Sequence, residues 1–113
     1  MEKRYRLRKN SAFQYVFRRG RSVACRCLVM LTAQSRELRI GFSVSKKVGD
    51  AVTRNLIKRR LLACFRPLIG DLKAALYVIV ARPAAAEATF QELQKSVTYL
   101  LNKQNAFREG NRA

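Results

Sequence analysis

The sequence contains no histidine and only seven acidic residues among its 113. Histidine is the commonest general base and the commonest metal ligand in proteins, so both roles lose their usual candidate. The acids are spread along the chain without a close pair, as Glu2, Glu37, Asp50, Asp71, Glu87, Glu92 and Glu109. A two-metal hydrolytic site would therefore have few carboxylate ligands available. We therefore expect no catalytic residue and no metal site within this chain.

Long hydrophobic runs are also missing, and cysteines are few. No segment approaches the roughly 18 consecutive apolar residues of a transmembrane helix. The basic start "MEKRYRLRKN" is not followed by the apolar segment of a signal peptide, so we expect a cytoplasmic protein. Three cysteines are an odd count, which argues against a disulfide framework. We expect Cys25 and Cys27 to be same-face residues of one strand rather than metal ligands.

Positive charge is the feature present in excess. Lys and Arg number 24, which gives a net charge of +17 and a pI near 11.1. With 49% hydrophobic residues the chain is expected to fold, as one domain over residues 1–113 whose ends, about 1–8 and 105–113, are flexible. Such a charge opposes compaction by self-repulsion, so we expect a polyanionic partner. Nucleic acid is the first candidate and an anionic membrane surface the second.

The first half of the chain is expected to form a helix and two strands. The segment "NSAFQYVFRRG" has apolar residues at helical spacing, with Asn10 or Ser11 as N-cap and Gly20 in a left-handed C-terminal position. Residues 25–33 and 38–44 are rich in strand formers, and the second run alternates between apolar and other residues. We expect these two runs to pair as an antiparallel hairpin with one covered face.

The second half is expected to form a helix, a strand and a helix. The helix over residues 51–66 begins at Asp50, a good N-cap, and is stopped by Pro67. The continuous apolar run at 75–81 is typical of a strand buried on both faces. A capping box, "TFQE", opens the last helix. The strands at 38–44 and 75–81 can form a parallel unit around the first of these helices, and the general rule makes that crossover right-handed.

The helix over residues 51–66 collects basic residues on one side. On a helical wheel, one half holds most of the apolar residues, namely Val52, Leu56, Ile57, Leu61, Ala63 and Cys64. The other half holds Arg54, Asn55, Lys58, Arg59 and Arg66, accompanied by Leu62 and Phe65. No acid lies four residues away to pair with these cations. The alternatives are a solvated charged face, a membrane-surface helix or a surface for a phosphate backbone, and the missing acids favour the last.

The loop before this helix adds to the cationic surface. It runs directly into the helix N-terminus and contains Ser43, Ser45, Lys46, Lys47 and Gly49. Loops of this type present hydroxyls, ammonium groups and backbone N–H groups to phosphate. An ordinary strand-to-helix connection is the alternative, and the basic context favours phosphate binding.

Three stretches resemble the protein subunit of bacterial ribonuclease P. They are "RLRKNSAFQYVFRRGRS", "IGFSVSKKVGDAVTRNLIKRRL" and "VIVARP", which occur in that family's order and spacing over nearly the whole chain. The resemblance implies an α+β fold, a single small α/β sandwich of αβββαβα order with a four-stranded mixed sheet. It also implies an unusual left-handed βαβ crossover (ribosomal protein S5 domain 2-like), against the general rule.

The resemblance further implies a function as one subunit of a tRNA-processing endonuclease. In that family a small basic protein binds a catalytic RNA, ribonuclease P RNA, and helps it remove 5′ leaders from precursor tRNAs. The RNA performs the chemistry with Mg²⁺, which agrees with the poor catalytic inventory of this chain. The implied assembly is one protein monomer with one RNA. A non-catalytic structural RNA-binding protein of the ribosomal-protein type is the alternative.

The RNA-binding residues follow from the matching motif and the basic helix. We expect phosphates of the catalytic RNA to contact Ser45, Lys46, Lys47, Arg54, Asn55, Lys58 and Arg59. Where the family usually has Arg-Asn-Arg, this chain has Leu56 in the third position, so an RNA contact there is lost or moved. Where the family commonly has Gly-Asn, this chain has Asp50 after the glycine, and its carboxylate mildly disfavours phosphate.

The resemblance also implies a cleft between the first helix and the sheet that receives the single-stranded leader. Its candidate residues are Phe13, Phe17 and Arg18. The two rings lie one turn apart and can stack on bases of any sequence, each stack being worth about 1–3 kcal/mol. Core packing is the alternative interpretation of both rings.

Overall fold

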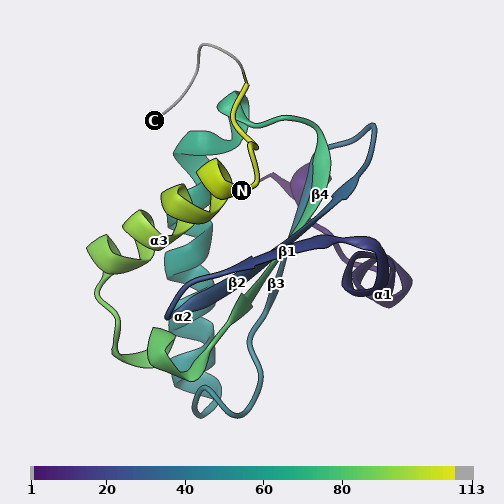
Figure 1. Ribbon diagram of the computed structural model, residues 1–113. Helices are drawn as coiled ribbons and strands as arrows, with labels where there is room; N and C mark the ends of the chain where they lie inside the picture. Colours follow the sequence, from purple (N-terminus) through teal and green to yellow (C-terminus); the bar gives the residue numbers. More distant parts are fainter. Residues whose placement is uncertain (1, 109–113) are drawn as a thin grey trace.

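A four-stranded mixed sheet forms the middle layer of the fold, with helices on both of its faces (Figure 1). The computed structural model describes residues 2–108. Its elements are α1 (Asn10–Arg19), β1 (Arg21–Ala24), β2 (Leu28–Gln34), β3 (Arg39–Ser43), α2 (Ala51–Phe65), β4 (Ala75–Ala81) and α3 (Phe90–Lys103). Short 3-10 helices occupy Lys3–Tyr5, Arg66–Asp71 and Pro83–Glu87. The α+β class and the αβββαβα order are confirmed.

Strand β4 lies between β2 and β3, in the sheet order β1-β2-β4-β3. It pairs antiparallel with β2, where Ile79 is opposite Met30, and parallel with β3, where Ile79 is opposite Phe42. The predicted parallel unit of β3, α2 and β4 is confirmed, and the predicted hairpin of β2 with β3 is wrong. The reason is that β4 is apolar on both faces and is best buried between two other strands. The left-handed sense of the crossover stays a prediction.

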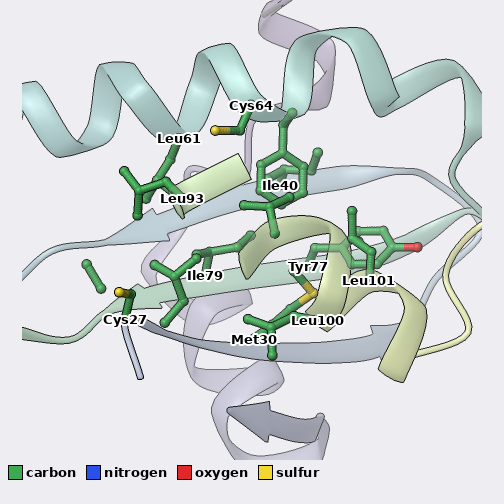
Figure 2. Close-up of a cluster of buried hydrophobic side chains, with 14 of the residues drawn as sticks. Cys27, Met30, Ile40, Leu61, Cys64, Tyr77, Ile79, Leu93, Leu100 and Leu101 are labelled. Atoms are coloured by element: carbon green, nitrogen blue, oxygen red, sulfur yellow. The ribbon is translucent and has the colours of Figure 1, made fainter. Parts of the chain in front are cut away.

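Two hydrophobic cores lie on the two faces of the sheet. The larger core joins the sheet to α2 and α3, and Figure 2 shows Leu61 of α2 and Leu100 of α3 gathered with Tyr77 and Ile79 of β4. The smaller core joins the opposite face to α1 and consists of Leu7, Val16, Ala33 and Val78. Full burial of one such large side chain contributes about 1.5–3 kcal/mol. Burial of β4 on both faces is confirmed, and the expectation of a single covered face is wrong.

Strand β1 and the turn after it differ from the sequence-based expectation. β1 pairs antiparallel with β2, and the chain reverses between Cys25 and Cys27. The N–H of Cys25 donates to the carbonyl of Leu28 at 2.9 Å, and Nη1 of Arg82 donates to the carbonyl of Cys25 at 3.1 Å. The two cysteines therefore belong to a tight turn and are not same-face strand residues. The sequence of β1 has no apolar run that would reveal a strand.

Two predicted helix caps are confirmed. Oδ1 of Asp50 accepts the N–H of Thr53 at 2.9 Å, which satisfies a free donor at the start of α2. At α3 the hydroxyl of Thr89 accepts the N–H of Glu92 at 3.1 Å, and the Glu92 carboxylate accepts the N–H of Thr89 at 2.9 Å. These reciprocal bonds form the predicted capping box.

Other helix ends correct the expectation. α1 begins after Lys9, which makes no side-chain cap, so neither Asn10 nor Ser11 has that role. Gly20 has a φ of −76° and is not left-handed; a Cβ there would lie 2.5 Å from the carbonyl oxygen of Val16, so close approach explains the glycine. α2 ends one residue earlier than expected and continues as the 3-10 helix Arg66–Asp71. Pro67 is tolerated in the first turn of this helix, because an N–H at that position would have no partner within the helix.

Both ends of the described chain are packed onto the fold. Leu7 is buried, and its N–H donates to the carbonyl of Ile40 at 3.0 Å. At the other end Phe107 is buried and forms an isolated bridge with Leu72. Leu7 and Phe107 are anchored by burial, and the flexibility of the ends over about 1–8 and 105–113 stays a prediction. Residues 1 and 109–113 lie outside the described residues.

Gly41 permits the close contact between α1 and β3. An added Cβ would lie 2.5 Å from Cζ of Phe13 and 3.1 Å from Cβ of Leu7. We expect Gly41→Ala to lower the free energy of unfolding by about 1–3 kcal/mol, because the new methyl group overpacks this contact. Urea unfolding measures the change.

Gly70 supplies the matched control, because an added Cβ there meets no atom within 4 Å. Gly70→Ala should be neutral or slightly stabilising. In a Phe13→Ala background, Gly41→Ala should lose most of its cost, since the ring it strikes is absent. If Gly41→Ala lowers the free energy of unfolding by the same amount in that background, the contact between α1 and β3 does not require Gly41.

Candidate nucleic-acid interface

The outward face of α2 carries apolar residues as well as cations. The helix buries Ile57, Leu61, Cys64 and Phe65. Val52 and Leu56 are 76% and 39% exposed. The helical wheel predicted these two on the buried side and Phe65 among the cations, and all three predictions are wrong. The cause is Phe65, which packs edge-on against Phe42 with ring centroids 5.8 Å apart and so turns the helix.

The cations of α2 differ in how far they are available. Lys58, Arg59 and the neighbouring Asn55 are exposed. Arg54 is half-buried, and its Nε is buried without a hydrogen-bond partner. Of the predicted RNA-binding residues on α2, Asn55, Lys58 and Arg59 therefore lie on the surface. Arg54 lies at the border between surface and core.

No carboxylate forms an ion pair with these cations in the part of the chain that the structure describes. The ion pairs of that part, at 3.4 and 2.8 Å, are Arg4–Glu2 and Arg39–Glu37. Nη1 of Arg60 donates to the carbonyl of Ala88 at 3.2 Å and fastens α2 to the segment before α3. The remaining basic side chains of α2 keep their charge free for a ligand.

The turn Ser45–Val48 lies directly before α2. The N–H of its last residue donates to the carbonyl of its first at 3.0 Å, and Ser45, Lys46 and Lys47 are exposed. The N-terminal end of a helix carries a partial positive charge, which adds to that of the two ammonium groups. At the same point the bonds from Thr53 hold the pKa of Asp50 below its usual value of 3.8, so one negative charge stays among the positive ones.

Helix α1 directs one aromatic ring to the sheet and another to solvent. Phe13 is half-buried and packs over Gly41 of β3. Phe17 is 41% exposed, and Arg18 beside it is exposed. The packing interpretation thus fits Phe13, while Phe17 and Arg18 are open to a ligand.

A row of sheet residues beside α1 is assembled by residues from three strands. Val29 of β2 lies opposite Val80 of β4, which lies opposite Ser43 of β3. All three are half-buried and face the α1 side, because the next residues, Met30 and Ile79, enter the other core. This row (Val29, Val80 and Ser43) joins the α1 side to the turn that follows β3. Strand alternation hints at the row, but the pairing register is needed to assemble it.

The described residues give no indication of a metal centre. Among residues 2–108, no three His, Cys, Asp or Glu side chains lie close enough together to hold a metal ion. Burial raises the pKa of the Cys64 thiol to about 11, so it remains a protonated packing residue. Over the same residues, no helix combines the length and apolarity that a membrane span requires.

The pKa of Asp50 makes the cap of α2 dependent on pH. The ionised carboxylate accepts from Thr53, so its stabilisation is complete above the unfolded pKa near 3.8 and is lost as pH falls through the lower folded value. Asp50→Asn keeps the acceptor without titrating. We expect the melting temperature of the wild type to fall relative to that of Asp50→Asn below about pH 4. A constant difference between pH 2 and pH 6 (about two units either side) would contradict this cap.

Comparison with known proteins agrees with this fold. A family model described as Ribonuclease P matches residues 1–105. The ribonuclease P protein component of Geobacillus kaustophilus is 43% identical over 114 residues, which covers 97% of this chain and 94% of that protein. The corresponding protein of Listeria innocua is 46% identical over 105 residues, with 89% and 88% covered. A solved structure of the Staphylococcus aureus RNase P protein matches with a TM-score of 0.87 at 36% identity, covering 92% of this chain and 98% of that one. The chain belongs to the family of ribonuclease P protein components, the protein partners in a ribonucleoprotein endoribonuclease.

Proposed function

We propose that the chain binds the catalytic RNA of ribonuclease P through the outward face of α2 and the turn Ser45–Val48. On the α1 side of the sheet it holds the 5′ leader of precursor tRNA, and so promotes removal of the leader. The RNA subunit supplies the chemistry with Mg²⁺. The assembly contains one copy of each subunit and works in the cytoplasm.

The unpaired positive charge of α2 is the observation that carries the contact with the catalytic RNA. Lys58 and Arg59 are exposed, and no carboxylate among residues 2–108 lies at ion-pair distance from them; Lys46 and Lys47 extend the charge beyond the helix start. Like charges at helical spacing cost a few tenths of a kcal/mol per pair. A phosphate backbone along this face would attract these cations, so its binding outweighs their mutual repulsion.

Arg54 offers a donor that the protein itself leaves unused. Its Nε is buried and unpaired, and an unsatisfied buried donor costs about 1–3 kcal/mol. A phosphate oxygen or a ribose hydroxyl at this point would satisfy it. Because the side chain is already half-buried, less rotamer freedom is lost when the RNA binds.

Leu56 changes the contact in the middle of the helix. Its side chain is 39% exposed, and Val52 one turn earlier is 76% exposed, so the face carries an apolar strip beside its cations. An apolar side chain cannot bind phosphate. The ionic contacts therefore pass to Lys58 and Arg59, with Asn55 as a neutral hydrogen-bonding neighbour.

The leader contact is supported by the exposed ring of Phe17. The ring projects from α1, which Phe13 fixes to the sheet, and Arg18 next to it can attract the leader phosphates. The row of Val29, Val80 and Ser43 gives this side a partly exposed floor. Stacking accepts any base, which suits leaders whose sequences vary.

Catalysis by the RNA subunit is supported by the residues that this chain contains. It has no histidine and only seven acids. Mg²⁺ prefers hard oxygen ligands, and RNA phosphates provide them in quantity. The chain's contribution is to position the substrate and to neutralise phosphate charge, which are effects of binding rather than bond making.

Alanine substitution on α2 tests the contact with the catalytic RNA. The slope of log affinity against log salt is negative. Lys58→Ala and Arg59→Ala should each reduce its magnitude by about one unit, because each removes one phosphate contact. Titration of purified protein with catalytic RNA at several salt concentrations measures the slope. Lys95→Ala is the control, since Lys95 is exposed on α3. If all three variants keep the wild-type slope, the RNA binds elsewhere.

Reconstitution at low Mg²⁺ tests the leader contact. The wild-type protein should strengthen the binding and cleavage of precursor tRNA relative to the RNA subunit alone. Phe17→Ala should weaken binding of the leader-bearing substrate about 5- to 150-fold, which corresponds to the loss of about 1–3 kcal/mol for one stack. Binding of a leaderless tRNA should be unchanged.

Tyr99→Ala is the matched control, because this ring is 49% exposed on α3 and lies outside the proposed leader path. It should affect neither substrate. Equal losses for both substrates with Phe17→Ala, together with a lower melting temperature, would make Phe17 a packing residue. A wild-type protein that leaves cleavage at low Mg²⁺ unchanged would overturn the proposed function.

A further inference from the structure

A basic cleft, distinct from the surface of α2 and the turn Ser45–Val48, lies at the opposite end of the sheet from that turn. That turn follows β3, and because β3 and β4 run parallel, it lies at the end where β4 finishes. The cleft, of about 900 Å³, is lined where β4 begins, where β2 ends and where β1 begins. Tyr15 of α1 and the residues Gln104 and Asn105 after α3 complete its rim.

Among the described residues, three cations line this cleft and none of the lining residues is acidic. Arg21 begins β1, Arg36 follows β2 and Lys73 precedes β4, and all are exposed. Of the acids near these cations in sequence, Glu37 is paired with Arg39 at 2.8 Å, and Asp71, two residues before Lys73, does not line the cleft. The local potential is therefore positive, and the cleft attracts anions.

The walls of the cleft are fixed before any ligand enters. Nε2 of Gln104 donates to the carbonyls of Arg21 and Met30 at 2.8 and 3.1 Å, which ties the end of α3 to β1 and β2. The hydroxyl of Tyr77 donates to the carbonyl of Lys73 at 2.8 Å and holds the backbone that carries this cation. Small side chains leave the space open, namely Ala33, Ala74, Ala75 and Ala106. Such a preformed site binds without first paying the entropy of ordering its walls.

Two groups in the cleft are suited to parts of a nucleotide. Thr32 lines the cleft, and its hydroxyl oxygen is buried without a hydrogen-bond partner. Tyr15 on the rim is 45% exposed and offers an aromatic face. An unpaired base would stack on the ring of Tyr15. A ribose hydroxyl would satisfy Thr32 if the atoms that cover its hydroxyl shift when the RNA binds.

We propose that this cleft binds a short single-stranded segment of RNA, with successive phosphates on Arg21, Arg36 and Lys73 and a base on Tyr15. Cations that come from separate elements suit a chain of phosphates better than one compact anion. The segment belongs to the catalytic RNA or to precursor tRNA. Contacts at both ends of the sheet fix the orientation of the protein on its RNA. The inference rests on the proposed role in a ribonucleoprotein, but not on the contacts of α2.

The double variant Arg36→Ala/Lys73→Ala tests the phosphate contacts in the full-length protein. The loss of two contacts with a single strand should reduce the magnitude of the negative salt slope of RNA affinity by about 1.4, at about 0.7 for each contact. One arm measures binding to catalytic RNA alone, and the other measures binding of precursor tRNA to preassembled holoenzyme. The arm in which the slope falls identifies the RNA that occupies the cleft.

Lys3→Ala/Lys95→Ala is the charge-matched control. Both residues are exposed and neither lines the cleft, so this variant should leave the slope close to that of the wild type. Equal changes from the two double variants would reduce the effect to general charge attraction and overturn the site. The melting temperatures of both variants should stay near the wild-type value, because all four side chains are exposed.

Photochemical cross-linking tests the base contact. Tyr15→p-benzoylphenylalanine should cross-link to unpaired nucleotides of the RNA that the salt slopes identify. The same amino acid at Tyr99, an exposed position on α3, should give no cross-link at those nucleotides. The absence of RNA cross-links from position 15, with unchanged salt slopes, overturns the proposal.

Lys58→Ala in the same titrations separates this inference from the proposed function. If Lys58→Ala lowers the slope and the cleft variant does not, the α2 interface stands and the second site is wrong. If only the cleft variant lowers it, the second site stands and the proposed α2 contact is wrong.

Discussion

The burial of β4 on both faces is the constraint on which the rest of the structure depends. Tyr77 and Ile79 enter one core and Val78 the other, so helices must cover both sides of the sheet. α1 covers one side, and α2 and α3 cover the other (Figure 1). Because α2 crosses from the end of β3 back to the start of β4, its N-terminal turn is left at the end of the sheet. The basic residues of that turn are thereby exposed by the same packing that buries β4.

The apolar interior leaves all of the charge of the described chain outside it. No polar or charged residue among residues 2–108 is buried, and the ion pairs join close neighbours in the sequence. The net charge of +17 therefore acts as surface repulsion, which opposes the compact state. RNA that binds the folded chain removes this repulsion, so association and folding stabilise each other. The fold accordingly tolerates a charge that would be a liability in a protein without a polyanionic partner.

The sequence predicted those parts of the fold that local interactions determine. Asp50 and the capping box at Thr89 act within one helical turn, and the apolar run at 75–81 signals two-sided burial by itself. The pairing of β2 with β4 depends on residues far apart in sequence, which strand alternation does not specify. The wheel for α2 misplaced Val52 and Phe65 because it contains the spacing of a helix but not the partner, here the ring on β3, that decides which side is buried.

The same distinction separates the predictable part of the interface from the rest. Lys46 and Lys47 are adjacent, and Lys58 and Arg59 lie on one stretch of helix, so their grouping was visible in the sequence. The row that crosses β4 at Val80 and the cleft that begins near Ala75 are assembled by strand pairing at the two ends of β4. A shift of one residue in this register would exchange the faces of every β4 side chain. The register of one apolar strand thus sets where the two proposed RNA contacts lie, at either end of the sheet.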